Sequence, residues 1–291
     1  EPLTTCSDAV CVDASGCVQV DNGSCASCNG TDCQSCSHGE GCAAGASALV
    51  PDTCCGIGDA LLKRGTGAAA EAVDIEVDGT YALLCGGFGV RVNRISDPDN
   101  PVFVGSATQR CQRAAFGRVL PDGSRVIYLA HHGDTWVPQP FLQTYRITPG
   151  DDLEPVQNFT EEGELYEGLH YAEPYLYVAT HSGGLRVYVA GSSGALSLVT
   201  VLPGFENATR LARRDQQLLV ADGEGGLKVV DIQNPAAPTI VQSLPTRGIA
   251  RDVVLAGARA FVALGGDGVD DFDAATEVLA PETWLDTPGS A

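Results

Sequence analysis

The sequence predicts an all-β protein: a β-propeller of four-stranded blades, preceded by a small disulfide-rich domain. Two observations carry this prediction. A phrase recurs about every 42 residues in the last two thirds of the chain, and the composition changes sharply near residue 55. Each copy is an apolar run, a glycine-rich turn and a second β-prone run, and the copies begin at Ala82, Leu176, Leu218 and Ala260. A unit of this length with several short β runs has the size of one propeller blade.

The last copy shows the four strands of one blade in order. Residues 251–255, 259–264, 269–273 and 278–285 are β-prone, and glycine-containing turns separate the first three runs. The same template divides the body of the chain into five units, at about 70–108, 109–160, 163–205, 206–247 and 248–290. Propellers of about four to eight blades are known. Five blades therefore either close the ring alone or are completed by another chain.

Residues 1–55 differ from this body, because they contain ten of the twelve cysteines and almost no large apolar residues. A segment this short, with so few large apolar residues, buries little apolar surface. Disulfide cross-links must therefore take the place of a hydrophobic core. We therefore expect a disulfide-rich domain at 1–55, a linker or edge strand at 56–69 and the propeller at 70–291. The ten cysteines are Cys6, Cys11, Cys17, Cys25, Cys28, Cys33, Cys36, Cys42, Cys54 and Cys55. Their spacing does not determine which of them pair.

Two CxxC pairs, Cys25/Cys28 and Cys33/Cys36, also suit zinc, which accepts four thiolates. Only four residues separate the two pairs, whereas zinc ribbons have about 15–20. The disulfide interpretation is therefore favoured.

The remaining cysteines, Cys85 and Cys111, are predicted to form a disulfide. Cys85 ends the second strand of the first unit and Cys111 opens the second unit. The blade template places both at the same face of adjacent blades, although Cys54 and Cys55 compete for the same partners.

Charge and cysteine usage together predict where the protein works. The net charge of −20 repels nucleic acid and anionic membrane surfaces. No apolar run approaches the roughly 18 residues that span a bilayer. The chain begins with Glu1 and contains no methionine, so we expect a mature form whose targeting segment was removed. Many cysteines in an oxidising space form disulfides, and we expect an extracellular or cell-surface location.

Several side chains are candidates for a site on the loop-rich face of the propeller. His132 and His181 occupy equivalent positions in neighbouring blades, where the other units have Gly87, Gly223 and Gly265, and two imidazoles there suit a transition metal. The alternative is two surface-loop histidines without a ligand. The aspartates at 267, 270, 271 and 273 (Asp267, Asp270, Asp271 and Asp273) suggest calcium, although they do not fit the EF-hand spacing and aspartate is also an ordinary turn residue.

Two further groups of residues point to binding. Trp136 and Phe141 lie in a proline-stiffened insertion of the second unit and either anchor a protein partner or pack on the propeller itself. Four arginines, Arg110, Arg113, Arg210 and Arg251, fall near the first strands around the channel. We expect them to bind an anion or to pair with carboxylates such as Asp252.

The motif at 226–241, GLKVVDIQNPAAPTIV, and the motif at 251–265, RDVVLAGARAFVALG, resemble the LVIVD-repeat β-propeller family. The resemblance covers about 70–290 and does not extend to the cysteine-rich region. It implies a secreted or surface-exposed bacterial protein. The family has no single shared activity, so no catalytic residues are carried over.

Three functional hypotheses follow. The first is a non-enzymatic interaction module that presents propeller loops to a protein partner. The second is a metal-binding protein or metalloenzyme that uses His132 and His181. The third is a subunit of a larger assembly in which missing blades are supplied by other chains. No Ser/His/Asp arrangement, phosphate loop or HExxH motif is present, so the sequence favours a non-enzymatic role. Calcium is the cofactor that it suggests.

Overall fold

The computed structural model describes residues 72–107, 110–131, 133, 139–159 and 165–285, with four short strands before residue 34. The chain divides into two compact units, residues 1–64 and 65–291. In the first unit, β1 (Ala9–Asp13) pairs with β2 (Gly16–Gln19), and β3 (Cys28–Asn29) pairs with β4 (Asp32–Cys33), both antiparallel. The predicted cross-links and the linker at 56–69 lie outside the described residues.

The second unit contains five four-stranded antiparallel sheets, and in each sheet the strands lie in chain order. We call these sheets blades 1 to 5. Blade 1 contains β5 (Ala72–Val77), β6 (Tyr81–Gly86), β7 (Gly89–Arg94) and β8 (Val102–Ala107). Blade 2 contains β9 (Arg113–Val119), β10 (Arg125–His131), β11 (Phe141–Ile147) and β12 (Leu153–Phe159). Blade 3 contains β13 (Gly168–Ala172), β14 (Tyr175–Ala179), β15 (Leu185–Ala190) and β16 (Leu196–Leu202).

Blade 4 contains β17 (Arg210–Arg214), β18 (Gln217–Ala221), β19 (Leu227–Asp231) and β20 (Thr239–Leu244). Blade 5 contains β21 (Asp252–Ala256), β22 (Arg259–Ala263), β23 (Val269–Asp273) and β24 (Ala280–Leu285). Each blade lies within one of the five units that the sequence predicts. The all-β propeller architecture is therefore confirmed.

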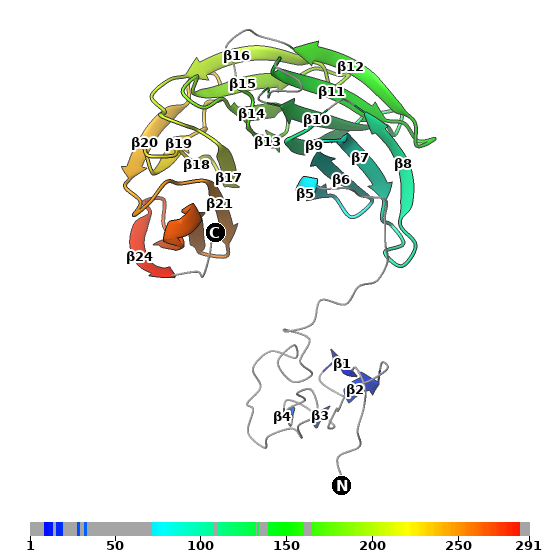
Figure 1. Cartoon of the computed structure of the whole chain (residues 1–291), viewed down its shortest axis with the longest axis horizontal. Helices are drawn as coiled ribbons and strands as arrows, with labels where there is room; N and C mark the ends of the chain where they lie inside the picture. Colours follow the sequence, from blue (N-terminus) through cyan, green and yellow to red (C-terminus); the bar gives the residue numbers. More distant parts are fainter. Residues whose placement is uncertain are drawn as a thin grey trace. The chain divides into compact units, whose positions relative to one another are not determined.

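The blades follow one another along an arc, with the first strand of each sheet on the inner side (Figure 1). Successive first strands contact one another, from β5 to β9, β13, β17 and β21. The arc formed by the described blades is not closed between β21 and β5 (Figure 1). Five blades therefore do not complete a ring in this structure.

The core lies between the blades, because the second strand of each blade is mostly apolar on both of its faces. Successive residues of a strand point to opposite sides of the sheet. In β18, Leu218 and Val220 accordingly pack against blade 3, while Leu219 and Ala221 pack against blade 5. All four side chains are fully buried. A blade inside the arc is thus covered on both faces.

In blades 3 and 4, the turn between the second and third strands connects the blade to the next one. His181, Gly223 and Gly265 share a left-handed backbone, with φ of 50°, 58° and 67°, which confirms that they are equivalent. The amide of His181 donates a hydrogen bond to Ala208 O at 3.0 Å, and Gly223 does the same to Ala250 O at 3.1 Å. Each bond joins one blade to the start of the following blade.

Two glutamines clamp the outer strands of neighbouring blades. Gln157 on β12 donates to Leu196 O and accepts from Leu196 N, at 3.2 and 2.6 Å. Gln242 on β20 makes the same pair of bonds to Leu279, at 2.7 and 3.0 Å. Each amide side chain acts as an additional strand partner, because it satisfies both backbone groups of one residue.

We expect Gln242→Ala to lower the free energy of unfolding by about 1–3 kcal/mol, because it leaves two backbone groups of the buried Leu279 unpaired. Thr283→Ala is the matched control, since Thr283 occupies the same register position on blade 5. Urea titration of both variants measures the difference. Equal midpoints for the two variants would contradict the clamp.

Candidate functional site: the inner wall and the two end faces

A disulfide joins β6 of blade 1 to the segment just before β9 of blade 2. Cys85 and Cys111 are bonded, with their Cα atoms 4.8 Å apart and a sequence separation of 26. Both side chains are buried, within a cluster that also contains Leu83 and Leu129. The predicted pairing of Cys85 with Cys111 is confirmed.

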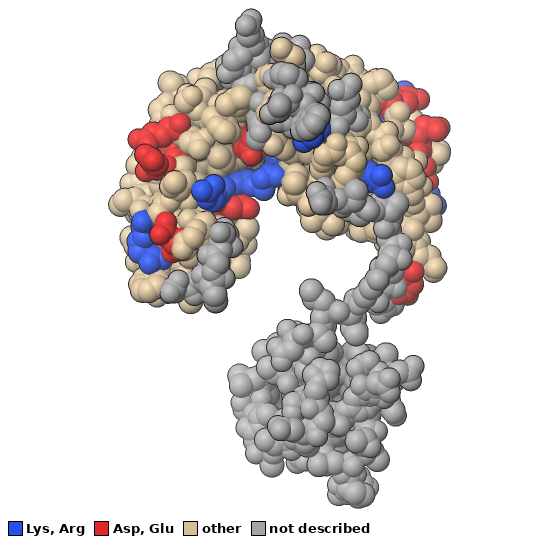
Figure 2. Space-filling view, in the orientation of Figure 1, with Lys and Arg blue, Asp and Glu red and all other residues tan. Residues whose placement is uncertain are grey.

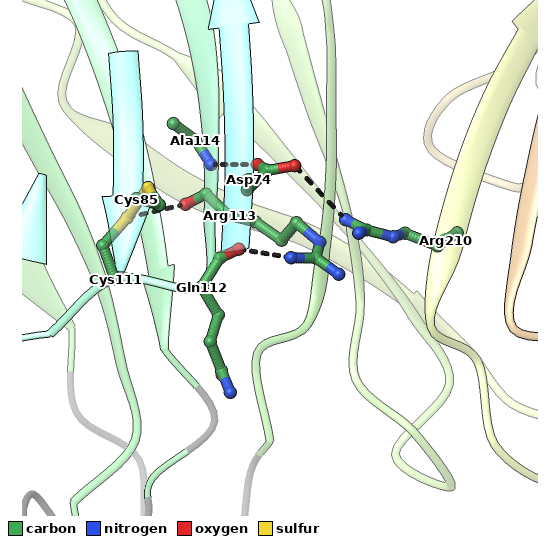
Figure 3. The surroundings of a disulfide bond; sticks show 7 residues. All are labelled: Asp74, Cys85, Cys111, Gln112, Arg113, Ala114 and Arg210. Atoms are coloured by element: carbon green, nitrogen blue, oxygen red, sulfur yellow. Dashed lines mark hydrogen bonds and ion pairs between the residues drawn. A yellow bond between two sulfur atoms is a disulfide. The ribbon is translucent and has the colours of Figure 1, made fainter. Parts of the chain in front are cut away.

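Basic side chains gather along the inner wall of the arc (Figure 2). Arg210 on β17 reaches both ends of the arc, because its guanidinium lies 3.8 Å from Asp74 on β5 and 3.5 Å from Asp252 on β21. The other oxygen of Asp74 accepts a hydrogen bond from Ala114 N at 3.2 Å (Figure 3). Blades 4 and 5 thus share one ionic cluster with blade 1, which lies at the other end of the arc. The expectation that these arginines pair with carboxylates such as Asp252 is confirmed for Arg210.

The carboxyl groups of this cluster are not fully compensated. Burial raises the pKa of Asp74, and the charge of Asp252 adds to the effect, while Arg113 and the bond from Ala114 oppose it. Burial also raises the pKa of Asp252. Desolvation and the charge of Asp74 raise the pKa of Glu76. The inner wall therefore takes up protons more readily than free carboxylates do.

The structure places the histidine candidates in two different environments. His181 lies in its turn with Nε2 3.5 Å from a carboxylate oxygen of Glu167. His131 is buried, and its ring lies 5.1 Å from that of Phe141. His132 lies outside the described residues, so a metal site shared with His181 stays a prediction. Among the described residues, no group of three or more metal-ligating side chains is gathered.

The aspartates proposed for calcium face different partners. Asp270 accepts from Arg247 Nε at 2.6 Å, and Asp271 pairs with Arg259 on the opposite face of β23. Asp273 accepts from the amide of Ala275 at 2.8 Å. Asp267 is exposed, and its backbone carbonyl accepts from Arg247 at 3.2 Å. Alternation along β23 places Asp270 on the face opposite to Asp271 and Asp273, and Asp267 precedes the strand, so the geometry does not gather all four around one ion.

The structure describes one of the two residues of the proposed aromatic anchor. Trp136 lies outside the described residues. Phe141 is the first residue of β11 and is 6% exposed, packed against His131. Phe141 therefore belongs to the propeller's own packing and does not present a surface to a partner.

The two end blades expose apolar residues that their counterparts bury. Ile75 pairs with Leu84 in blade 1, as Ala114 pairs with Leu129 in blade 2 and Val253 with Val262 in blade 5. Ile75 is 61% exposed, whereas Ala114 and Val253 are each 3% exposed. Val73 and Val77 are exposed on the same strand. We call this surface, with Val73, Ile75 and Val77, the leading face.

The other end of the arc shows the complementary surface. Val254 pairs with Phe261 in blade 5, as Ala115 pairs with Tyr128 in blade 2. Val254 is 55% exposed, whereas Ala115 is 7% exposed. Phe261 is only partly buried. We call this surface, with Val254 and Phe261, the trailing face. Neither face was predicted from the sequence, although the count of five blades was the signal for them.

These features define a propeller-type protein whose blades resemble a known repeat. A family model described as the LVIVD repeat matches residues 217–246, which span β18 to β20 and the turn that follows. The resemblance found in the sequence is therefore confirmed. No curated protein sequence matches the chain.

Solved structures agree on the fold. A functionally unknown protein from Desulfotomaculum acetoxidans is 13% identical, with 75% of this chain and 71% of that chain covered and a TM-score of 0.60. A protein from Bacteroides uniformis provisionally named a 6-phosphogluconolactonase is 14% identical, with 72% and 68% covered and a TM-score of 0.60. Sqt1 of Saccharomyces cerevisiae is 11% identical, with 75% and 62% covered and a TM-score of 0.56. At these identities, the similarity establishes the architecture alone.

Within the described part of the chain, no helix is long and apolar enough to cross a membrane.

We expect the double variant Cys85→Ala/Cys111→Ala to lose about 2–4 kcal/mol of folding free energy, because the open loop gives the unfolded chain more freedom. Alanine suits the test because both side chains are buried. Thermal unfolding of the oxidised wild type and the variant measures the loss. A free thiol at either position in the oxidised wild type, detected by alkylation and mass spectrometry, would contradict the bond.

We expect Arg210→Ala to destabilise the fold by about 1–2 kcal/mol at pH 7, because Asp74 and Asp252 lose a shared cation. The pKa values of Asp74 and Asp252 are raised in the folded chain, so protonation of these two carboxylates stabilises the fold. This stabilisation is complete below the ordinary pKa of 3.8 and is lost as the pH rises through the folded pKa. The stability lost in Arg210→Ala should therefore become smaller toward pH 4, where the carboxylates no longer need the cation.

Asp74→Asn in the Arg210→Ala background should restore part of the stability at pH 7, since the amide oxygen still accepts from Ala114 N. Chemical denaturation across pH measures both effects. A loss of equal size at every pH would show that Arg210 acts by packing alone.

Proposed function

We propose that this chain is a non-enzymatic interaction module of the cell exterior, which assembles with protein partners through the leading and trailing faces of its blade arc. The observation that carries the proposal is the exposure of Ile75, whose equivalents Ala114 and Val253 are buried by a preceding blade. Blade 1 is thus built to be covered by another sheet. An exposed apolar face of this kind marks an interaction surface.

A second copy of the chain supplies a matching sheet. The trailing face of one copy presents Val254 and Phe261, and the leading face of another presents Ile75 and Leu84. Packing them together repeats the contact that each interior blade makes with the next. Asp271 also lies on the trailing face, but Arg259 pairs with it, so the charge enters the contact already compensated.

This contact joins two different surfaces, so it is heterologous. Such contacts produce a closed ring when the rotation closes and an open filament when it does not. The proposal therefore predicts assemblies larger than a symmetric dimer. The disulfide between Cys85 and Cys111 and the ten cysteines before residue 56 support an oxidising, extracellular setting.

We expect the full chain to self-associate in light scattering. Ile75→Asp blocks the leading face, Val254→Asp blocks the trailing face, and each variant alone should be a monomer. A mixture of the two variants should form a one-to-one dimer and nothing larger, because one intact face of each kind remains.

Leu198→Asp is the control, because Leu198 is exposed on the outer strand of an interior blade; this variant should assemble like the wild type. A wild-type chain that stays monomeric at high concentration would overturn the proposed assembly.

A further inference from the structure

A cavity of about 600 Å³ lies between blades 4 and 5, away from the inner wall and from both end faces. The turn between β17 and β18, the segment after β19 and the turn between β23 and β24 line it. Three carboxylates are among the lining groups: Asp215, Asp231 and Glu277. Val241 and Val278 add apolar surface. A cavity with an apolar wall and a few polar groups is the usual form of a ligand site.

The one arginine in the wall is already occupied. Arg214 donates to the backbone carbonyls of Ala274 and Glu277, at 2.7 and 3.0 Å. Gln217 donates to the same carbonyl of Glu277 at 3.1 Å. These bonds fix the turn between β23 and β24 as a wall of the cavity. They leave the side chain of Glu277 exposed and uninvolved.

None of the three carboxylates forms an ion pair with an arginine or lysine of the described residues. Asp231 accepts one hydrogen bond, from Gln233 N at 2.8 Å to Oδ1. Its second oxygen is left for another donor. The cavity thus has three negative charges against the single, engaged charge of Arg214.

The corresponding place between blades 1 and 2 shows what fits there. Tyr81 pairs in register with Arg94, as Gln217 pairs with Asp231 in blade 4. Arg94 therefore occupies in blade 1 the position of Asp231. Arg94 pairs with Asp151 in the turn between β11 and β12, and Tyr81 OH donates to the same carboxylate at 2.9 Å. In blades 1 and 2, the chain's own guanidinium meets a carboxylate of the next blade.

Between blades 4 and 5 the cation is replaced by an anion. Asp231 stands where Arg94 would be, and Glu277 lies in the turn that corresponds to that of Asp151. Arg214 donates to the backbone of this turn, but no described guanidinium pairs with the two carboxylates themselves. A planar guanidinium has five N–H donors and suits two carboxylates at once.

We propose that this cavity binds the guanidinium of an arginine side chain on a protein partner, with Asp231 and Glu277 as its acceptors. That the arginine comes from a protein rests on the proposed interaction function, whereas the site itself does not. The net charge of −20 draws a cationic segment toward the chain. Recognition is thus by charge and by hydrogen bonds to a single side chain.

Titration calorimetry of the full chain at low salt tests the site, with the blocked peptide Ac-Gly-Arg-Gly-NH2 as the probe. The wild type should bind it weakly, and the same peptide with neutral citrulline should not bind. Asp231→Asn should weaken the binding by about fivefold or more, since it removes one charge of an exposed ion pair.

Asp273→Asn is the matched control. Asp273 has the same position in blade 5 and the same hydrogen bond to an amide two residues on, but no following blade forms a cavity beside it. It should bind the peptide like the wild type. Equal weakening by Asp231→Asn and Asp273→Asn, equal binding of citrulline, or no binding by the wild type would overturn the site.

Two more measurements separate this inference from the proposed assembly. Ile75→Asp should bind the arginine peptide like the wild type, so loss of assembly leaves the cavity testable. Agmatine, a free guanidinium compound, should bind less tightly than the peptide. If it binds equally well, the cavity serves a small cation and the assignment to a protein segment is wrong.

Discussion

Apolar packing between the faces of adjacent sheets is the interaction on which the whole second unit depends. A four-stranded sheet with two apolar faces is not stable alone, and each blade is completed only by its neighbours. Leu218 and Leu219, adjacent in sequence, serve two different interfaces. The same requirement explains the exposed residues at the ends of the arc. Ile75 and Val254 are apolar, as at the equivalent interior positions, but no adjacent blade covers them. The end faces are thus a consequence of the repeat itself.

Polar contacts add precision to this packing. The glutamine clamps lie at the outer strands between blades 2 and 3 and between blades 4 and 5. At the equivalent position blade 1 has Gly105, which has no side chain to form a clamp and which Leu153 approaches closely. On the inner wall, Arg210 connects blades 1, 4 and 5. The interfaces between blades therefore share the same apolar packing but differ in their polar contacts.

The architecture was readable from the sequence because the repeat, its strand pattern and its turns are local features. The bond between Cys85 and Cys111 followed from the same template, since both residues lie at equivalent ends of adjacent blades. The contacts across the arc were not readable. Asp74 and Arg210 are far apart in sequence, and their approach depends on the curvature of four successive blades. The scattering of the aspartates at 267–273 was implied by strand alternation, but acidic composition alone suggested a common ligand.

The disulfide lies at one end of the open arc, so the two ends of the arc differ in how easily they unfold. Blade 1 is tied to blade 2 through Cys85 and Cys111, while the described residues hold blade 5 to blade 4 by non-covalent contacts only: apolar packing, hydrogen bonds and the ion pair between Arg210 and Asp252. In an array of nearest-neighbour contacts, the terminal module with the weaker attachment opens first. Fraying therefore begins at β24 and proceeds toward β13, so the amides of 252–285 exchange with solvent before those of the first two blades.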